Sequence, residues 1–135
     1  MKNTLQAGAL VLIAGIATAE NLAGVDRFIC SSAQAQICFE TGECFSAIPW
    51  ELDVPDFIVV DLDKKTVSTT EASNLNRSSD FSKVEKADGV IYVQGIEDGR
   101  AFSFVIHEST GHMTAAIARD GFSVTVFGAC TDVDI

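Results

Sequence analysis

The sequence predicts an all-β protein, a small antiparallel β-meander that closes into a barrel or a curled sheet tied by two disulfides. Three observations support this fold class: apolar and polar residues alternate with period two, Asp-Gly pairs separate the runs, and four cysteines follow an export-type N-terminus. A β-sandwich is the alternative architecture. No segment carries an apolar repeat at helical spacing, although residues 25–35 could hold one short turn of helix.

The N-terminus has the pattern of a cleaved signal peptide. Met1 and Lys2 precede an apolar stretch from Leu5 to Ala17, and small residues end it at Ala19. We therefore expect residues 1–19 to be a signal peptide and residues 20–135 to form a single β domain in the periplasm or outside the cell. The apolar run is shorter than the roughly 20 residues that a membrane span needs, so no membrane insertion is expected after cleavage.

The chain is acidic, with 9 Lys and Arg against 19 Asp and Glu and a formal net charge of −10. Nucleic acids and anionic membrane surfaces attract basic patches, so the charge argues against both as partners. The acidic residues are scattered, which indicates a role in solubility.

An even number of cysteines behind a signal peptide predicts two disulfides, for which three pairings are possible. Cys38 and Cys44 flank a five-residue hairpin that contains Gly42, so they can lie opposite each other. Cys30 and Cys130 would then join the start of the domain to its end. The spacings lack the close pairs typical of structural zinc sites.

The second half predicts a four-stranded meander, because three turns fix its registers. With two-residue loops at 98–99, 109–110 and 120–121, Phe104 pairs with Val93 on one side and Ala115 on the other, and Ala115 pairs with Val126. These registers place the large apolar side chains on one face: Ile91, Val93, Phe102, Phe104, Ile106, Met113, Ala115, Ile117, Val124 and Val126.

Upstream, residues 38–48 predict a hairpin, and residues 57–62 and 66–70 predict two strands joined by a turn. The polar segment 71–89 is interpreted as a long loop. About eight strands are expected in total, the number of many small barrels.

No catalytic residues are expected, because no nucleophile lies in a recognisable motif. His107, Glu108 and His112 form the one candidate metal site, since the predicted register makes the two histidines cross-strand neighbours. A third protein ligand beyond these is not identifiable, so two surface histidines beside a turn are the favoured interpretation. No cofactor is expected.

Two features could form a binding surface. Trp50 is the sole tryptophan and could anchor a partner, although a place in the core or as a lid over one end of the barrel is favoured. Tyr92, Val105 and Phe127 form a stripe with Thr114 on the face away from the predicted core. We expect another strand or the N-terminal segment to cover this stripe, and its exposure would favour a binding role.

Residues 94–103, 110–114 and 127–131, with the early cysteine cluster and residues 60–65, resemble a group of small exported proteins common in alphaproteobacteria. That group has no assigned function, so the resemblance implies export and a single domain only. The layout is also loosely similar to periplasmic lysozyme inhibitors, which are small disulfide-closed barrels, but their inhibitory loop motifs are not recognisable here.

The leading functional hypothesis is an exported, non-enzymatic binding or accessory protein of the cell envelope, with an unidentified protein or envelope component as its partner. A structural or stress-protective envelope protein without a specific ligand is the second hypothesis. A weak metal-dependent hydrolase at the hairpin of His107 and His112 is the third.

Overall fold

The computed structural model describes Gly8 and residues 21–133. The predicted cleavage site and all of the predicted signal peptide except Gly8 lie outside the described residues. Within them, ten strands form one antiparallel sheet with the order β5-β4-β3-β1-β10-β9-β8-β7-β6, and β2 pairs with β1 beside this path. The strands are β1 (Arg27–Phe39), β2 (Cys44–Ala47), β3 (Phe57–Asp61), β4 (Thr66–Thr69), β5 (Ser78–Asp80), β6 (Lys83–Ala87), β7 (Val90–Glu97), β8 (Arg100–His107), β9 (His112–Arg119) and β10 (Phe122–Asp132).

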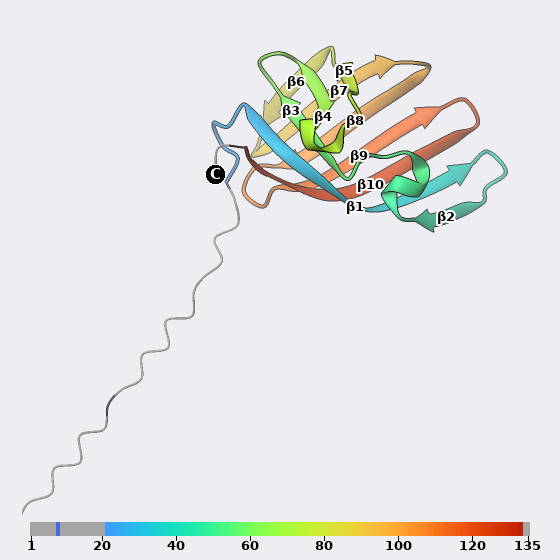
Figure 1. Cartoon of the computed structure of the whole chain (residues 1–135), viewed down its shortest axis with the longest axis horizontal. Helices are drawn as coiled ribbons and strands as arrows, with labels where there is room; N and C mark the ends of the chain where they lie inside the picture. The colour runs from blue at the N-terminus through green and yellow to red at the C-terminus, as the bar shows by residue number, and fades with distance from the viewer. Residues whose placement is uncertain (1–7, 9–20, 134–135) are drawn as a thin grey trace, which may run out of the picture.

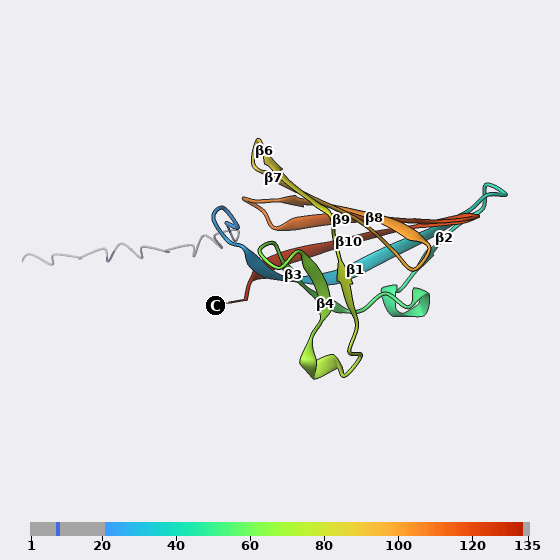
Figure 2. The same ribbon diagram turned by 90° about the horizontal axis from the view of Figure 1, so that it is seen from above.

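The sheet curls so that its two edges, formed by β5 and β6, approach each other, as the two views in Figures 1 and 2 show. The all-β, curled antiparallel prediction is therefore confirmed. Two short 3-10 helices, η1 (Pro49–Leu52) and η2 (Glu71–Ser73), lie in the connections that follow β2 and β4. Among the described residues, no helix is long and apolar enough to cross a membrane.

The meander β7–β10 has the predicted registers. Val93 pairs with Phe104, Phe104 with Ala115, and Ala115 with Val126. Asp98 and Gly99 both have positive φ, at 48° and 74°, as the favoured two-residue hairpin turn requires. The turn residues therefore set the register, and the register places the apolar face inward.

The interpretation of residues 71–89 as a long loop is wrong. This segment contains η2, β5 and β6, and it joins the two edges of the curled sheet: β5 pairs with β4, and β6 pairs with β7. The chain passes from one edge of the sheet to the other between two neighbouring residues. The amide of Phe81 donates to Lys65 O, next to β4, and the amide of Ser82 donates to Gln94 O of β7. Backbone pairing stabilises these short polar strands, so no apolar alternation marks them in the sequence.

Strand β1 contains residues 27–35 of the segment 25–35, where a helical turn was considered, so that prediction is wrong. Its first half pairs with β3 and its second half with β2, on either side of a bulge between Ser32 and Gln34. Gly128 lies opposite this bulge, where an added Cβ would overlap Ser31 O. A bulge with a facing glycine bends the strand pair and increases its twist, which helps the sheet to curl.

Both predicted disulfides are present, Cys30–Cys130 and Cys38–Cys44. Each joins directly paired residues, the first between β1 and β10 and the second between β1 and β2. The first disulfide lies in the hydrophobic core, where Cys30 and Cys130 are buried among Phe28, Val60 and Ile106.

Candidate functional site

A cavity of about 340 Å³ occupies one end of the curled sheet, called here the open end. It lies towards the turns at 98–99 and 120–121, between the inner face of β8–β10 and the segments that contain β4 and β5. The inner face of the meander supplies an apolar wall, made by Phe102, Phe104, Met113, Ala115, Ile117, Phe122, Val124 and Val126. The facing wall is mixed, with Ile58 and Val67 beside the hydroxyl-bearing residues Ser68, Thr69, Ser78 and Ser79.

Burial decreases along each strand of the apolar wall towards this end. On β8, Ile106 has no exposed surface, Phe104 and Phe102 are 7% exposed, and Arg100 at the start of the strand is half-buried. On β9, Ala115 is buried but Arg119 at the end of the strand is exposed. The same strands therefore pass from a packed core to the wall of an open cavity.

The edges of the sheet separate where the cavity opens. β6 pairs with β7 only up to Gln94, so no strand of the described residues pairs with Gly95, Ile96 and Glu97 on that side, and Ile96 is 83% exposed. Gly95 permits a close approach, because an added Cβ would overlap the Phe102 ring and lie 3.0 Å from Asp80 O.

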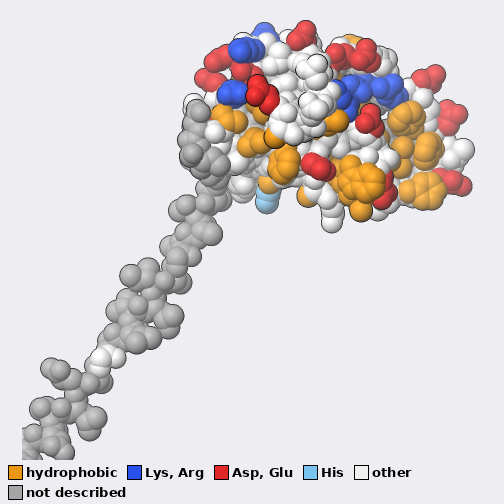
Figure 3. All heavy atoms as spheres, viewed as in Figure 1, with side chains coloured by type: hydrophobic (Ala, Val, Ile, Leu, Met, Phe, Trp, Pro, Cys, Tyr) orange, Lys and Arg blue, Asp and Glu red, His pale blue; other side chains and the backbone are white. Residues whose placement is uncertain are grey.

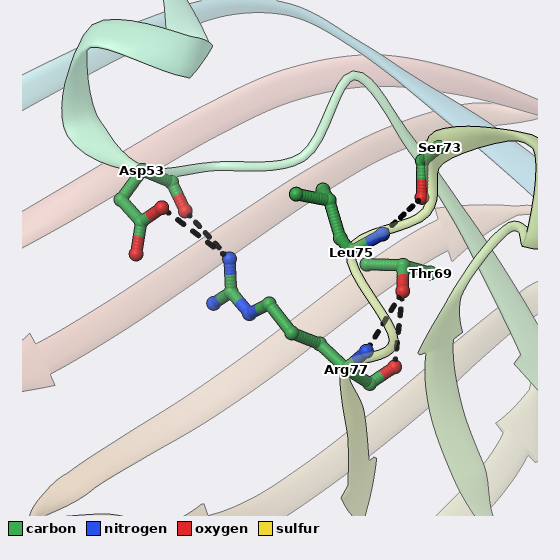
Figure 4. Close-up of polar contacts among 5 residues, drawn as sticks. All are labelled: Asp53, Thr69, Ser73, Leu75 and Arg77. Carbon is green, nitrogen blue, oxygen red and sulfur yellow. Dashed lines mark hydrogen bonds and ion pairs between the residues drawn. The ribbon is translucent and has the colours of Figure 1, made fainter.

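Arg77 is among the residues that line the cavity, and its side chain points towards Asp53 (Figure 4). Its guanidinium donates to Asp53 O at 3.0 Å and lies 3.6 Å from the Asp53 carboxylate. Its backbone is held by Thr69, whose Oγ1 accepts from the Arg77 amide at 3.0 Å and donates to the Arg77 carbonyl at 3.2 Å. Arg77 therefore connects the end of η1 to β4 and has its charge partly matched.

Arg100 and Arg119 are different, because they occupy directly opposite positions on β8 and β9 and neither forms an ion pair with another described residue. They are directly paired positions and both line the cavity. Within residues 21–133, neither guanidinium has an ion pair or a side-chain hydrogen bond. Glu97 pairs in register with Arg100 on its other side, but its Oε2 is buried without a hydrogen-bond partner. Like charges in directly opposite positions destabilise a sheet, so an anion between these arginines would be stabilising.

Exposed aromatic and aliphatic side chains lie beside the open end and are called here the apolar rim; its members are Phe39, Phe45, Ile48, Trp50 and Phe57. Figure 3 shows large hydrophobic side chains gathered over the region of the β1–β2 hairpin and η1. The Phe39 ring lies 6.4 Å from that of Phe45 and 6.2 Å from that of Phe122, which lines the cavity. The rim is therefore continuous with the cavity wall. Trp50 is 61% exposed, so its favoured place in the core is wrong, and it does not line the cavity as a lid.

The stripe of Tyr92, Val105 and Phe127 has the predicted register, with Thr114 between the last two. These three side chains are 40%, 42% and 48% exposed. No strand among the described residues covers them, so the expected cover is not found there. The stripe is an exposed apolar strip on the outer face of the meander, separate from the cavity.

His107 and His112 lie beside the turn between β8 and β9, and both are exposed. His107 Nδ1 is 3.1 Å from Ser109 Oγ, a local contact within the turn. Among the described residues, no group of three or more metal-ligating side chains comes together, so His107, Glu108 and His112 do not form a metal centre in this structure.

Sequence reasoning missed the cavity and its arginines, although one signal was present. Three of the chain's four arginines, Arg77, Arg100 and Arg119, line this one cavity. The predicted register already placed Arg100 two residues before Phe102 and Arg119 two residues after Ile117, on the inward face. Two inward-facing arginines at the same end of a two-stranded apolar face, one on each strand, were therefore readable from the alternation.

These features define the class of the protein: a small disulfide-tied domain with a curled antiparallel sheet and an open-ended apolar cavity. Comparisons with protein-family models, with curated proteins and with solved structures find no match to this chain.

Proposed function

We propose that this chain is an exported, non-enzymatic binding protein of the cell envelope that holds a small, mainly apolar ligand in the open end of its curled sheet. The single observation that carries the proposal is the cavity of about 340 Å³, which is mainly apolar with a few convergent polar groups. Ligand sites commonly have this composition and volumes of roughly 300–1,000 Å³.

The disulfides support the exported location in this proposal. All four cysteines are in disulfides, a state typical of the periplasm and of secreted proteins. The resemblance to small exported proteins of alphaproteobacteria and the signal-peptide pattern belong to the same proposal.

A neutral fluorescent probe, N-phenyl-1-naphthylamine, tests whether the cavity binds apolar ligands. Its fluorescence rises in apolar surroundings, so we expect saturable enhancement with the disulfide-bonded protein. Ala115→Phe fills the cavity from β9 and should abolish the enhancement. Ala116→Phe is the matched control, because Ala116 is the next residue of the strand and is exposed on the outer face.

A second filling variant, Val67→Phe, enters the cavity from β4, where Val67 is only half-buried. Circular dichroism melting of each variant separates loss of binding from loss of folding. Equal enhancement with all three variants would place the probe elsewhere, for example on the outer stripe. No enhancement with the unaltered protein would contradict the proposal and favour a structural or stress-protective role.

A further inference from the structure

We infer that the ligand of this cavity is a single-chain carboxylate amphiphile, a medium-chain carboxylic acid whose head group binds between Arg100 and Arg119. This inference rests on the proposed function and names its ligand class. In this arrangement the hydrocarbon chain lies against the inner faces of β8, β9 and β10, and the carboxylate remains at the mouth.

The arginine pair defines the head-group site. Arg100 and Arg119 are opposite each other on paired strands, line the cavity and have no anionic partner within residues 21–133. A guanidinium group carries N–H donors in a planar fork that matches the geometry of a carboxylate, and paired positions on adjacent strands bring two such side chains within reach of one head group. A carboxylate between them would also relieve the repulsion between the two positive charges.

The overall charge favours a monoanion over a more highly charged head group. The chain has a net charge of −10, Glu97 pairs in register with Arg100, and Asp53 lies beside Arg77, the third arginine that lines the cavity. The negative charge of the protein would repel a second negative charge on the ligand. The arginine pair would add little binding energy for that second charge, because the first charge already neutralises the pair in part. We therefore expect a carboxylate to bind more tightly than a dianionic phosphate monoester with the same chain.

The apolar wall and the apolar rim define the site for the chain. The apolar wall begins at the next inward-facing residue after each arginine of the pair. This residue is Phe102 on β8, next to Arg100, and Ile117 on β9, next to Arg119. A ligand anchored by its head group at the arginines therefore meets only apolar side chains along the meander. Phe122 links this wall to Phe39 of the rim, so part of a longer chain could leave the cavity along an apolar surface.

Isothermal titration calorimetry with four ligands of equal chain length tests this inference: decanoate, decyl phosphate, decanol and decyltrimethylammonium, each below its micelle concentration. We expect decanoate to bind the unaltered protein most tightly and the cationic amphiphile most weakly. The double variant Arg100→Gln and Arg119→Gln should weaken decanoate binding by about tenfold or more, because it removes charge-assisted hydrogen bonds. Decanol binding should be unchanged in the same variant.

Arg27→Gln is the control for loss of positive charge, because it removes one arginine charge, half the change in the double variant, at a position outside the cavity. It should leave decanoate affinity unchanged. The inference is overturned if decanol binds as tightly as decanoate, or if the double variant retains full decanoate affinity. It is also overturned if decyl phosphate or decyltrimethylammonium is preferred.

The naphthylamine probe separates this inference from the proposed function. If the probe binds in the cavity but decanoate shows no preference, the cavity remains a ligand site and only the carboxylate assignment fails. If neither the probe nor decanoate binds, both fail together.

Discussion

The two ends of the curled sheet are built from the same strands but are filled in opposite ways. At the packed end, Phe28, Ile91 and Ile106 have no exposed surface and belong to the same core cluster as the Cys30–Cys130 disulfide. At the open end, the inward positions of β8 and β9 finish in Arg100 and Arg119 around a cavity.

The segment that precedes β1 accounts for part of this difference. Leu22 is fully buried, and its amide donates to Glu108 O at 2.7 Å, so the segment closes the packed end. The amide of Leu62 donates to Asp26 O, which fastens the same segment to the end of β3. At the open end, Arg77 and residues 52–55 only line the mouth. Buried packing is thus concentrated at one end, and the cavity lies at the other.

Removing the same side chain at each end gives the largest expected contrast. Phe28→Ala should lower the free energy of unfolding by about 3–5 kcal/mol, because it leaves a cavity in a closed core. Phe122→Ala, at a half-buried position on the cavity wall, should cost about 1 kcal/mol. Urea denaturation of the two variants measures the difference, and equal losses would mean that the open end contributes to stability as the packed end does.

The disulfides provide the next contrast. Cys30 and Cys130 are 100 residues apart in the sequence, and Cys38 and Cys44 are 6 apart. In the chain-entropy model the long loop is worth about 4–5 kcal/mol and the short loop about 2–2.5 kcal/mol. Paired Cys→Ala variants, compared by denaturation midpoint, should therefore show the greater loss for Cys30 and Cys130. The reverse order would indicate that the β1–β2 hairpin, beside the open end, limits stability.

The sequence predicted the meander well because its registers depend on local chemistry. Turn residues such as Asp98 and Gly99 fix each hairpin, and the alternation then decides which face is buried. The disulfide pairing followed in the same way, since Cys38 and Cys44 flank one hairpin.

The remaining elements depend on contacts that no local pattern records. β5 and β6 are short and polar, and their backbone pairing with β4 and β7 makes them strands. The cavity is a place where the facing walls do not meet, which depends on how far the sheet curls. Trp50 is exposed because η1 buries Pro49 instead, and hydrophobicity alone does not distinguish these two outcomes.

The smallest expected difference is in the free energy of unfolding of two single variants, at Arg119 and at Arg27. It tests whether the arginine pair at the open end lowers the stability of the ligand-free protein. Arg119→Gln removes one of two facing like charges, so it should raise the free energy of unfolding of the ligand-free protein by about 0.2–1 kcal/mol. Arg27→Gln makes the same change of net charge, but Arg27 pairs in register with Asp61, so stability should stay the same or fall. Thermal and urea unfolding at low salt measure both variants. A gain for Arg119→Gln alone would mean that the arginine pair is maintained against stability, as expected of a binding site. A loss in both variants would mean that Arg119 has a favourable role in the fold itself, which would remove the repulsion argument for an anionic ligand.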